Sequence, residues 1–208
     1  MSKKKEQISF VSRGGLKLEH ALNEFHLDVR GKTALDVGAA TGGFTDCLLQ
    51  RGAAKVYTVD VSYGQLAWKL RQDPRVVVLE RTNVRNLTAE KLYSRKQKAE
   101  SSEQKANERA ELAVIDVSFI SLTKVLPVVY GLLAEKAKVI ALIKPQFEAR
   151  REQVPRGGVI KDQAVRDETV ERIKKAAVGT GFTIGGQTES PIQGADGNVE
   201  YLIWLIKG

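Results

Sequence analysis

The sequence predicts an α/β fold in which helices cover both faces of a mostly parallel sheet. Short apolar runs alternate with helix-patterned segments from one end of the 208-residue chain to the other. Such alternation is typical of parallel strands joined by crossover helices. The last two apolar runs are joined by a loop rich in turn residues and are expected to form a hairpin. The final strand is therefore expected to be antiparallel.

Five apolar runs have the length and the valine and isoleucine content of buried strands. They are too short for helices and are bounded by glycine, proline or charged residues. We expect these strands at 33–37, 55–60, 75–80, 111–116 and 138–144. The two runs of the hairpin, 181–186 and 200–207, complete a sheet of seven strands.

Three segments between the strands carry clear helix signals. In 15–26, apolar residues recur at i, i+3, i+4 and i+7, which indicates one buried helix face. The segment 44–52 ends on a glycine, in the manner of a helix cap. A third helix is expected from about Asp162, with acidic residues early and basic residues late, the order that the helix dipole favours.

Composition excludes several classes of protein. With 42% hydrophobic and 28% charged residues, the chain can bury one sizeable core. Its single cysteine, Cys47, excludes a disulfide framework and a zinc site built on two or more cysteines. The longest apolar run, 201–206, is far short of the roughly 20 residues that span a bilayer. We expect a soluble, cytoplasmic protein with no membrane partner, whose net charge of +8 favours a polyanionic one.

The chain is expected to form one domain, 10–208, preceded by a short polar tail at 1–9. One stretch, 94–111, is polar and nearly devoid of large apolar groups. We interpret it as a solvated surface insertion, with a binding arm as the alternative.

A glycine-rich turn, 38–43, follows the first predicted strand. Such a turn lets the backbone approach a ligand at the carboxyl edge of the sheet. A Walker phosphate loop requires a lysine after the last glycine, where Phe44 stands, and a dinucleotide fingerprint requires a glycine where Ala40 stands. The turn instead resembles motif I of methyltransferases that use S-adenosylmethionine (SAM), a ligand without phosphate.

This resemblance implies a set of cofactor-binding residues. In the loop, they are Gly38, Ala39, Gly42, Gly43 and Phe44. Asp36 is expected near the cationic methionine end of SAM, and Asp60 can accept both hydroxyls of an adenosine ribose. Asn83 stands where an adenine contact is expected, with a turn asparagine as the alternative.

Polar side chains gather at one edge of the predicted sheet. The carboxyl ends of parallel strands open on the same crevice, and an antiparallel final strand begins there. The residues at these positions are Asp36, Asp60, Asn83, Asp116, Lys144 and Glu200. One such residue is ordinary at a strand end, but six together indicate a functional site. Asp116 is a candidate for both cofactor binding and catalysis.

Five separated segments carry a family resemblance. They are VSRGGLKLEHAL, LDVGAATGGFTDCLLQRGA, IDVSFISL, IKPQFE and SPIQGADGNVEYL. In this order they resemble the TlyA family, often named hemolysins, which belongs with the FtsJ-like ribose 2′-O-methyltransferases. The resemblance covers 10–207 and implies a Rossmann-like SAM-dependent methyltransferase fold that acts on cytidine ribose in ribosomal RNA. Family members begin with an S4-like RNA-binding domain, so 1–9 is expected to be a remnant of the linker that follows it.

The resemblance also implies a catalytic tetrad, with no metal, at Lys17, Asp116, Lys144 and Glu200. A ribose 2′-hydroxyl must lose its proton, and a lysine can take it near neutral pH only if its pKa falls. A second lysine and partial burial both lower a lysine pKa. We assign Lys144 as the base, Lys17 as its charged neighbour, and the two carboxylates as orienting groups.

Basic residues flank the predicted crevice along the chain. They are Arg13, Arg150, Arg151, Arg156 and Lys161. As phosphate contacts with ribosomal RNA or a ribosomal subunit they would make binding fall steeply with salt, and scattered surface charge is the alternative. Two other functions stay open: a SAM- or RNA-binding module without catalysis, and a membrane-lysing protein. Cys47 falls inside a predicted helix and is expected to pack there rather than act as a nucleophile.

Overall fold

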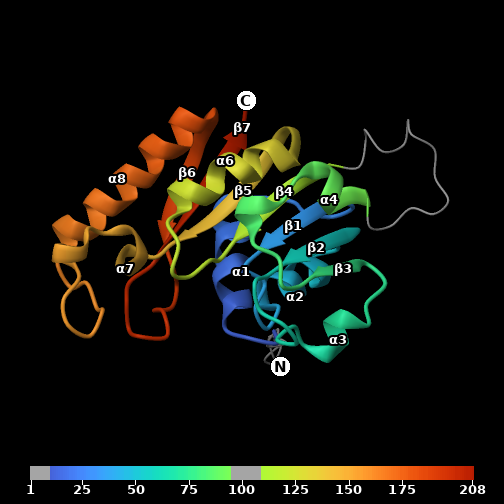
Figure 1. The fold of residues 1–208 in the computed structure, drawn as a ribbon, viewed down its shortest axis with the longest axis horizontal. Helices are drawn as coiled ribbons and strands as arrows, with labels where there is room; N and C mark the ends of the chain where they lie inside the picture. Colours follow the sequence, from blue (N-terminus) through green and yellow to red (C-terminus); the bar gives the residue numbers. More distant parts are fainter. Residues whose placement is uncertain (1–9, 95–108) are drawn as a thin grey trace, which may run out of the picture.

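A seven-stranded sheet forms the centre of the protein. The structure, a computed structural model, describes residues 10–94 and 109–208. The strand order is β3-β2-β1-β4-β5-β7-β6 (Figure 1). Strands β3, β2, β1, β4 and β5 pair in parallel, whereas β7 is antiparallel to both β5 and β6. The predicted fold class, a mostly parallel sheet with an antiparallel last strand, is confirmed.

The strands lie close to the predicted positions, with two differences in length. Their bounds are β1 Thr33–Val37, β2 Lys55–Val59, β3 Val76–Leu79, β4 Ala110–Ile115, β5 Leu133–Ile143, β6 Phe182–Glu189 and β7 Tyr201–Lys207. Strand β5 begins earlier than predicted because Leu133 pairs with Ala110 across a register shift, and polar residues conceal this extension in the sequence. Strand β6 is an edge strand whose polar end alternates between half-buried and exposed, and it continues to Glu189.

Helices precede and follow the strands as expected. Their bounds are α1 Gly14–Glu24, α2 Gly43–Gln50, α3 Trp68–Arg71, α4 Ala89–Tyr93, α6 Leu122–Leu132, α7 Pro145–Glu148 and α8 Gln163–Thr180, with 3-10 turns η1 Val84–Asn86 and η3 Arg151–Gln153. The carboxylate of Asp162 accepts a hydrogen bond from the N–H of Ala164, which explains why α8 begins there. Gly181 ends it with φ of 110°.

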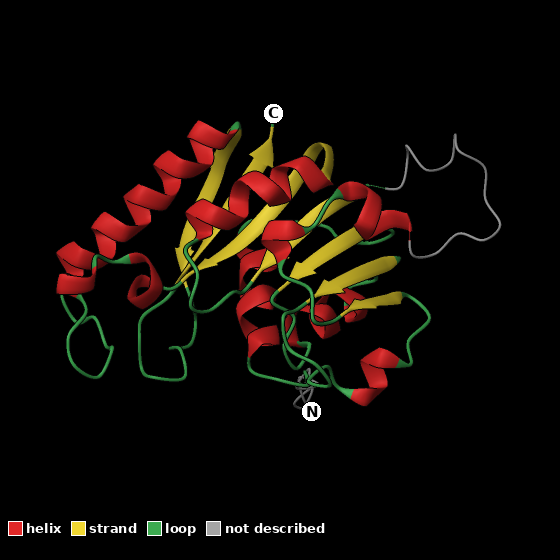
Figure 2. Ribbon diagram, in the orientation of Figure 1, coloured by secondary structure: helices red, strands yellow, loops and turns green. Residues whose placement is uncertain are grey.

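The helices cover both faces of the sheet (Figure 2). On one face α1 and α2 bury Leu22 and Leu48 against the strands. On the other face α6 and α8 bury Leu126 and Ile173. Both cores are built from side chains of the central strands, so the strands are held rigidly and their carboxyl ends present loops at a fixed edge.

Two predicted regions fall wholly or mostly outside the described residues. These are the tail, 1–9, and most of the polar insertion, 94–111. At the edges of the insertion, Ser94 follows the end of α4, and β4 begins at Ala110, so the last residues of the predicted insertion belong to the sheet. In the part of the chain that the structure describes, no helix has the length and apolarity needed to cross a membrane.

Candidate active site

Four charged residues from four elements meet at the carboxyl edge of the sheet. Asp116 directly follows β4, and Lys144 directly follows β5. Glu200 immediately precedes β7, and the pairing of Ile143 with Tyr201 brings it beside the end of β5. Lys17 comes from the first turns of α1, which packs against α2 on one side of this edge.

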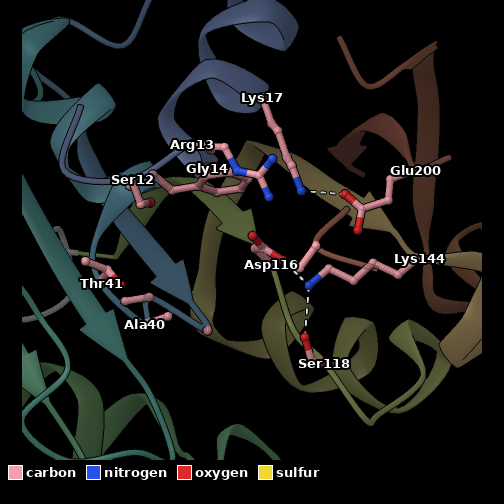
Figure 3. A pocket seen from close by; sticks show the side chains of 15 residues that line it. Ser12, Arg13, Gly14, Lys17, Ala40, Thr41, Asp116, Ser118, Lys144 and Glu200 are labelled. Atoms are coloured by element: carbon pink, nitrogen blue, oxygen red, sulfur yellow. Dashed lines mark hydrogen bonds and ion pairs between the residues drawn. The ribbon is translucent and has the colours of Figure 1, made fainter. Parts of the chain in front are cut away.

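The four side chains form two ion pairs that point into one space (Figure 3). Nζ of Lys17 lies 2.5 Å from Oε2 of Glu200, and both residues are buried, with 8% and 2% exposed. Nζ of Lys144 lies 2.6 Å from Oδ1 of Asp116 and donates a hydrogen bond of 3.0 Å to Oγ of Ser118. Each lysine is thus held by a carboxylate from another element, as an ordered site requires.

The loop between β6 and β7 covers Glu200. A Cβ added to Gly194 would lie 2.5 Å from Oε1 of Glu200, so the loop backbone packs directly on this carboxylate. The loop is held by Asn198, which is 1% exposed. Its amide nitrogen donates to the carbonyl of Gly158 at 2.9 Å, and its oxygen accepts from the N–H of Ile160 at 2.9 Å. The β6–β7 loop and the loop before α8 are therefore joined into one wall beside Glu200.

Two adjoining cavities open at this edge. The smaller, of about 310 Å³, is lined by Ser12, Arg13, Gly14, Lys17, Gly38, Ala39, Ala40, Thr41, Gly43, Phe44, Asp116, Ser118, Lys144, Ala195 and Glu200. The larger, of about 820 Å³, has apolar walls that include Val59, Val84 and Ile120, with a few polar groups among them. Both volumes are in the range of small-molecule sites. The cavities share four residues, Gly38, Ala40, Asp116 and Ser118.

The glycines of the turn after β1 are required mainly by contacts within the protein. Gly38 has φ of 84°, and a Cβ there would lie 2.3 Å from the carbonyl oxygen of Asp116. A Cβ on Gly42 would collide with Leu70, and one on Gly43 with Ser12. The structure shows close approach of neighbouring elements, and the close approach of a ligand stays a prediction. Gly42 lines neither cavity, while Gly38, Ala39, Gly43 and Phe44 line the smaller one.

Asp36 does not lie where the sequence led us to expect it. Its side chain points beneath the turn, is fully buried and lines neither cavity. The hydroxyl of Thr45, in α2, donates to its Oδ2 at 2.6 Å, while Oδ1 has no hydrogen-bond partner. Burial raises the pKa of Asp36 to about 7, against the opposing effect of the Thr45 hydrogen bond. Asp36 thus joins β1 to α2 under the turn.

This raised pKa predicts a pH-dependent stability. The folded protein retains a proton on Asp36 that the unfolded chain releases between about pH 4 and pH 7, so the free energy of unfolding falls as the pH rises through that range. An Asp36→Asn variant mimics the protonated carboxyl. As the pH rises from 5 to 8, we expect the free energy of unfolding of this variant to increase by on the order of 2–4 kcal/mol relative to that of wild type. Urea unfolding of both proteins at several pH values measures this difference.

Asp28→Asn is the matched control for that comparison. Asp28 is exposed, and hydrogen bonds from Arg30 lower its pKa to about 2, so it stays ionised across the range. Its stability difference from wild type should not change between pH 5 and pH 8. An Asp36→Asn difference that is equally flat would contradict the assigned protonation.

Asp60 and Asn83 both line the larger cavity. Oδ2 of Asp60 accepts from the N–H of Ala40 at 2.8 Å, and Oδ1 accepts from the N–H and hydroxyl of Ser62. A carboxylate accepts about four hydrogen bonds, so one position stays open for a ligand hydroxyl. Asn83 uses its oxygen to accept the N–H of Arg85 and begin η1. Asn83 is therefore a turn residue that also lines the larger cavity, and its contact with adenine stays a prediction.

The predicted basic residues divide into two groups. Arg13 directly precedes α1 and reaches into the smaller cavity (Figure 3). Arg150, Arg151 and Arg156 lie after α7 and line neither of the two cavities. Arg150 pairs with Glu168 at 3.1 Å on the surface, while Arg156 and Lys161 line a separate groove. This groove adjoins the wall that Asn198 holds in place.

Several cavity residues were not singled out from the sequence. They are Ser12, Thr41, Ser62, Gln65, Thr82, Val117 and Ala195. Small and polar residues in loops carry no local sequence signal for a site. For Ser62 and Val117, closeness in sequence to Asp60 and Asp116 is the only feature that indicates a place in the cavity. Cys47 is buried in α2, where burial raises the pKa of its thiol to about 12, so little thiolate forms near neutral pH.

Known proteins resemble this chain along nearly its whole length. The family of FtsJ-like methyltransferases matches residues 10–207. TlyA of Mycobacterium tuberculosis, a 16S/23S rRNA (cytidine-2′-O)-methyltransferase, is 47% identical over 95% of this chain and 68% of that protein. Hemolysin A of Brachyspira hyodysenteriae is 43% identical over 97% of this chain and 78% of that protein. The chain thus spans about two thirds of the length of the curated rRNA methyltransferase relatives that it matches first.

Solved structures agree with this relationship. A crystal structure from Lactococcus lactis, of a protein provisionally named a hemolysin, has 50% identity and a TM-score of 0.87 and covers 97% of this chain and 90% of that chain. A SAM-dependent methyltransferase from Mesorhizobium loti shares the fold at 16% identity, with a TM-score of 0.61 over 90% of this chain and 96% of that one. The family match and these relatives show that the chain belongs to the FtsJ-like methyltransferase family.

Proposed function

We propose that residues 10–208 form one methyltransferase domain that transfers a methyl group from SAM to a ribose 2′-hydroxyl in ribosomal RNA. One observation carries this proposal: two lysine–carboxylate pairs line the smaller cavity, and Asp116 of one pair also lines the larger cavity beside it. The rRNA (cytidine-2′-O)-methyltransferase activity named for the Mycobacterium relative supports cytidine as the target nucleoside. Such a substrate places the protein in the cytoplasm.

The larger cavity fits the adenosine part of SAM. Its apolar walls suit a purine ring, and Asp60 offers its one open acceptor position to a ribose hydroxyl. The residues shared by the two cavities, among them Gly38 and Asp116, lie where the methionine part would continue toward the tetrad. When bound there, SAM supplies an electrophilic methyl group.

The smaller cavity is proposed to hold the target ribose. With SAM bound, the 2′-oxygen would bond to the methyl carbon as the bond from that carbon to sulfur breaks, and the hydroxyl proton would pass to Nζ of Lys144, which must be a neutral amine to accept it. Asp116 holds this lysine in place at 2.6 Å and compensates the charge that the amine gains. Glu200 holds Lys17 at 2.5 Å, and together with Arg13 this lysine presents positive charge toward an adjacent phosphate. Most of the rate enhancement is expected from fixing the hydroxyl in line with the methyl group.

Binding of the RNA backbone is assigned to the basic loops at the same edge. Arg150, Arg151 and Arg156 are surface residues of the segment that borders the wall beside Glu200. Contacts of arginine with phosphate release counterions, so the affinity for rRNA should fall steeply as salt rises. The net charge of +8 supports a polyanionic partner.

Methyl transfer from labelled SAM tests the proposal. The purified protein is incubated with ribosomal subunits and with naked rRNA, and the nucleosides are then separated by mass spectrometry. We expect the label on 2′-O-methylcytidine. A label on a base, or no transfer although calorimetry shows SAM binding, would contradict the proposal, and the second outcome would favour a binding module without catalysis.

Asp60→Ala is expected to weaken SAM binding by about 10- to 100-fold, the effect of losing hydrogen bonds to a charged group. The variant removes the proposed partner of a ribose hydroxyl and also the acceptor that holds the N–H of Ala40. Isothermal titration calorimetry with SAM measures the change. Asp73→Ala is the control, because Asp73 holds Arg75 and lines neither cavity. Equal affinities of the two variants would refute the assignment of Asp60.

A further inference from the structure

Two short segments determine where Lys144 lies. Lys144 begins the segment 144–149, which contains α7, and its Nζ contacts Asp116 and Ser118 of the segment 116–121, which connects β4 to α6. Both segments are loops or short turns beyond the rigid sheet. The position of the amine relative to these partners therefore depends on what joins the two segments.

A buried carboxylate joins them. Glu148, the last residue of α7, is only 2% exposed although its side chain ends in a carboxyl group. Its Oε1 accepts the N–H of Leu122 at 2.8 Å, and its Oε2 accepts the hydroxyl of Ser121 at 2.6 Å. Ser121 is the N-terminal cap of α6, so one side chain from the Lys144 segment satisfies the helix start that ends the Asp116 segment.

The electrostatic surroundings of Glu148 suit this role. The N-terminus of α6 carries partial positive charge, and a guanidinium nitrogen of Arg172, from α8, lies 3.3 Å from Oε2. Arg172 is half-exposed, so its contribution is screened by solvent, whereas the two bonds to α6 are shielded from it. Apart from the contacts of Lys144 itself, the rings of Phe119 and Phe147 also meet between the segments, with centroids 4.9 Å apart, but the Phe119 side is 90% exposed. The buried link is the one through Glu148.

We propose that Glu148 is a positioning residue for methyl transfer: it fixes the segment 116–121 against the segment 144–149 and so sets Nζ of Lys144 against Asp116 and Ser118. For its effect on activity this inference rests on the proposed function. It does not require Glu148 to touch RNA or SAM. We call the hydrogen bonds of Glu148 to Ser121 and Leu122 the clamp. Displacement of a reacting group by about 1 Å can lower a rate by about 100-fold, so loss of the clamp should lower kcat.

Variants at three positions test the clamp. In Glu148→Ala and the shorter Glu148→Asp, kcat per SAM-binding site, measured at saturating SAM, should fall by about 30- to 100-fold, with the KM for rRNA nearly unchanged. The Kd for SAM should rise as well, because the segment 116–121 lines the larger cavity. Glu148→Gln can still bridge Ser121 and Leu122 and should restore kcat to within about threefold of wild type. Arg172→Ala, which removes only the contact to α8, should leave kcat unchanged.

Counting SAM-binding sites by calorimetry separates positioning from folding, since a purely structural role lowers the number of sites and not kcat per site. If Glu148→Ala does not fold, Glu148→Asp and Ser121→Ala take its place. Wild-type kcat per site in these variants, or an equal loss in Arg172→Ala, would overturn the proposal. Amide hydrogen exchange provides a readout independent of activity: Leu122 should exchange faster in Glu148→Ala and Glu148→Asp than in wild type.

The two proposals fail in different ways. If the wild-type protein transfers no methyl group to rRNA, the proposed function fails, and exchange at Leu122 still decides whether Glu148 joins the segments. If the wild type is active and exchange at Leu122 is the same in wild type and variants, the clamp fails alone.

Discussion

Replacing Lys144 by alanine is expected to lower methyl transfer to rRNA by about 100- to 10,000-fold, the range for loss of a general base. The Kd for SAM should stay within about threefold of wild type, because Lys144 lines the smaller cavity and not the larger one. The reason is chemical: the amine lies beside Asp116 and Ser118, at the place where the ribose hydroxyl must lose its proton. Single-turnover transfer of labelled methyl, with calorimetry for SAM, measures both effects.

A second variant separates proton transfer from charge. Lys144→Arg keeps a positive charge next to Asp116, but a guanidinium cannot give up its proton in a protein. It should therefore be as inactive as Lys144→Ala. Lys174→Ala is the control, since Lys174 pairs with Glu171 on the surface of α8. An active Lys144→Arg variant would mean that Lys144 supplies charge, and the proton acceptor would then have to be sought elsewhere.

The fold and most of the charged site could be predicted because both follow from one regularity. Apolar runs bounded by turn residues define strands, and parallel strands end at one edge. Asp116, Lys144 and Glu200 were placed together by this argument alone, and the register of β5 with β7 shows why it holds. Lys17 was different, because a lysine on an amphipathic helix has no local mark. It was identified only through the family resemblance.

Orientation and long-range contacts could not be predicted. Asp36 occupies a strand position next to the edge, but alternation along β1 turns its side chain beneath the turn to Thr45. The glycines after β1 gave a correct signal for a special backbone, but their close contacts with neighbouring elements could not be predicted. Asn198 and Glu148 form hydrogen bonds across 26 or more positions of sequence, and nothing in their immediate neighbours indicates the partner. These contacts become visible only when the elements are packed.

A substitution in the turn after β1 is expected to have a large effect on stability. Gly38→Ala is expected to lower the free energy of unfolding by about 2–5 kcal/mol, the sum of strain at positive φ and overpacking. The new Cβ would lie 2.3 Å from the carbonyl oxygen of Asp116 and 2.9 Å from its carbonyl carbon, and backbone atoms cannot rotate away as a side chain does. Urea unfolding, with SAM calorimetry on the folded protein, measures the change.

Gly31→Ala is the matched control, because Gly31 has φ of 71° and no atom within 4 Å of an added Cβ. The free energy of unfolding of Gly31→Ala should fall by about 1 kcal/mol, from backbone strain alone. The difference between the two variants therefore reports the contact of the turn with the end of β4. Because Gly38 and Asp116 line both cavities, relief of this contact must move the turn or Asp116, and SAM affinity should fall in Gly38→Ala only. Equal stability of the two variants would mean that the ends of β1 and β4 can separate freely, which is incompatible with an Asp116 held rigidly enough to orient Lys144.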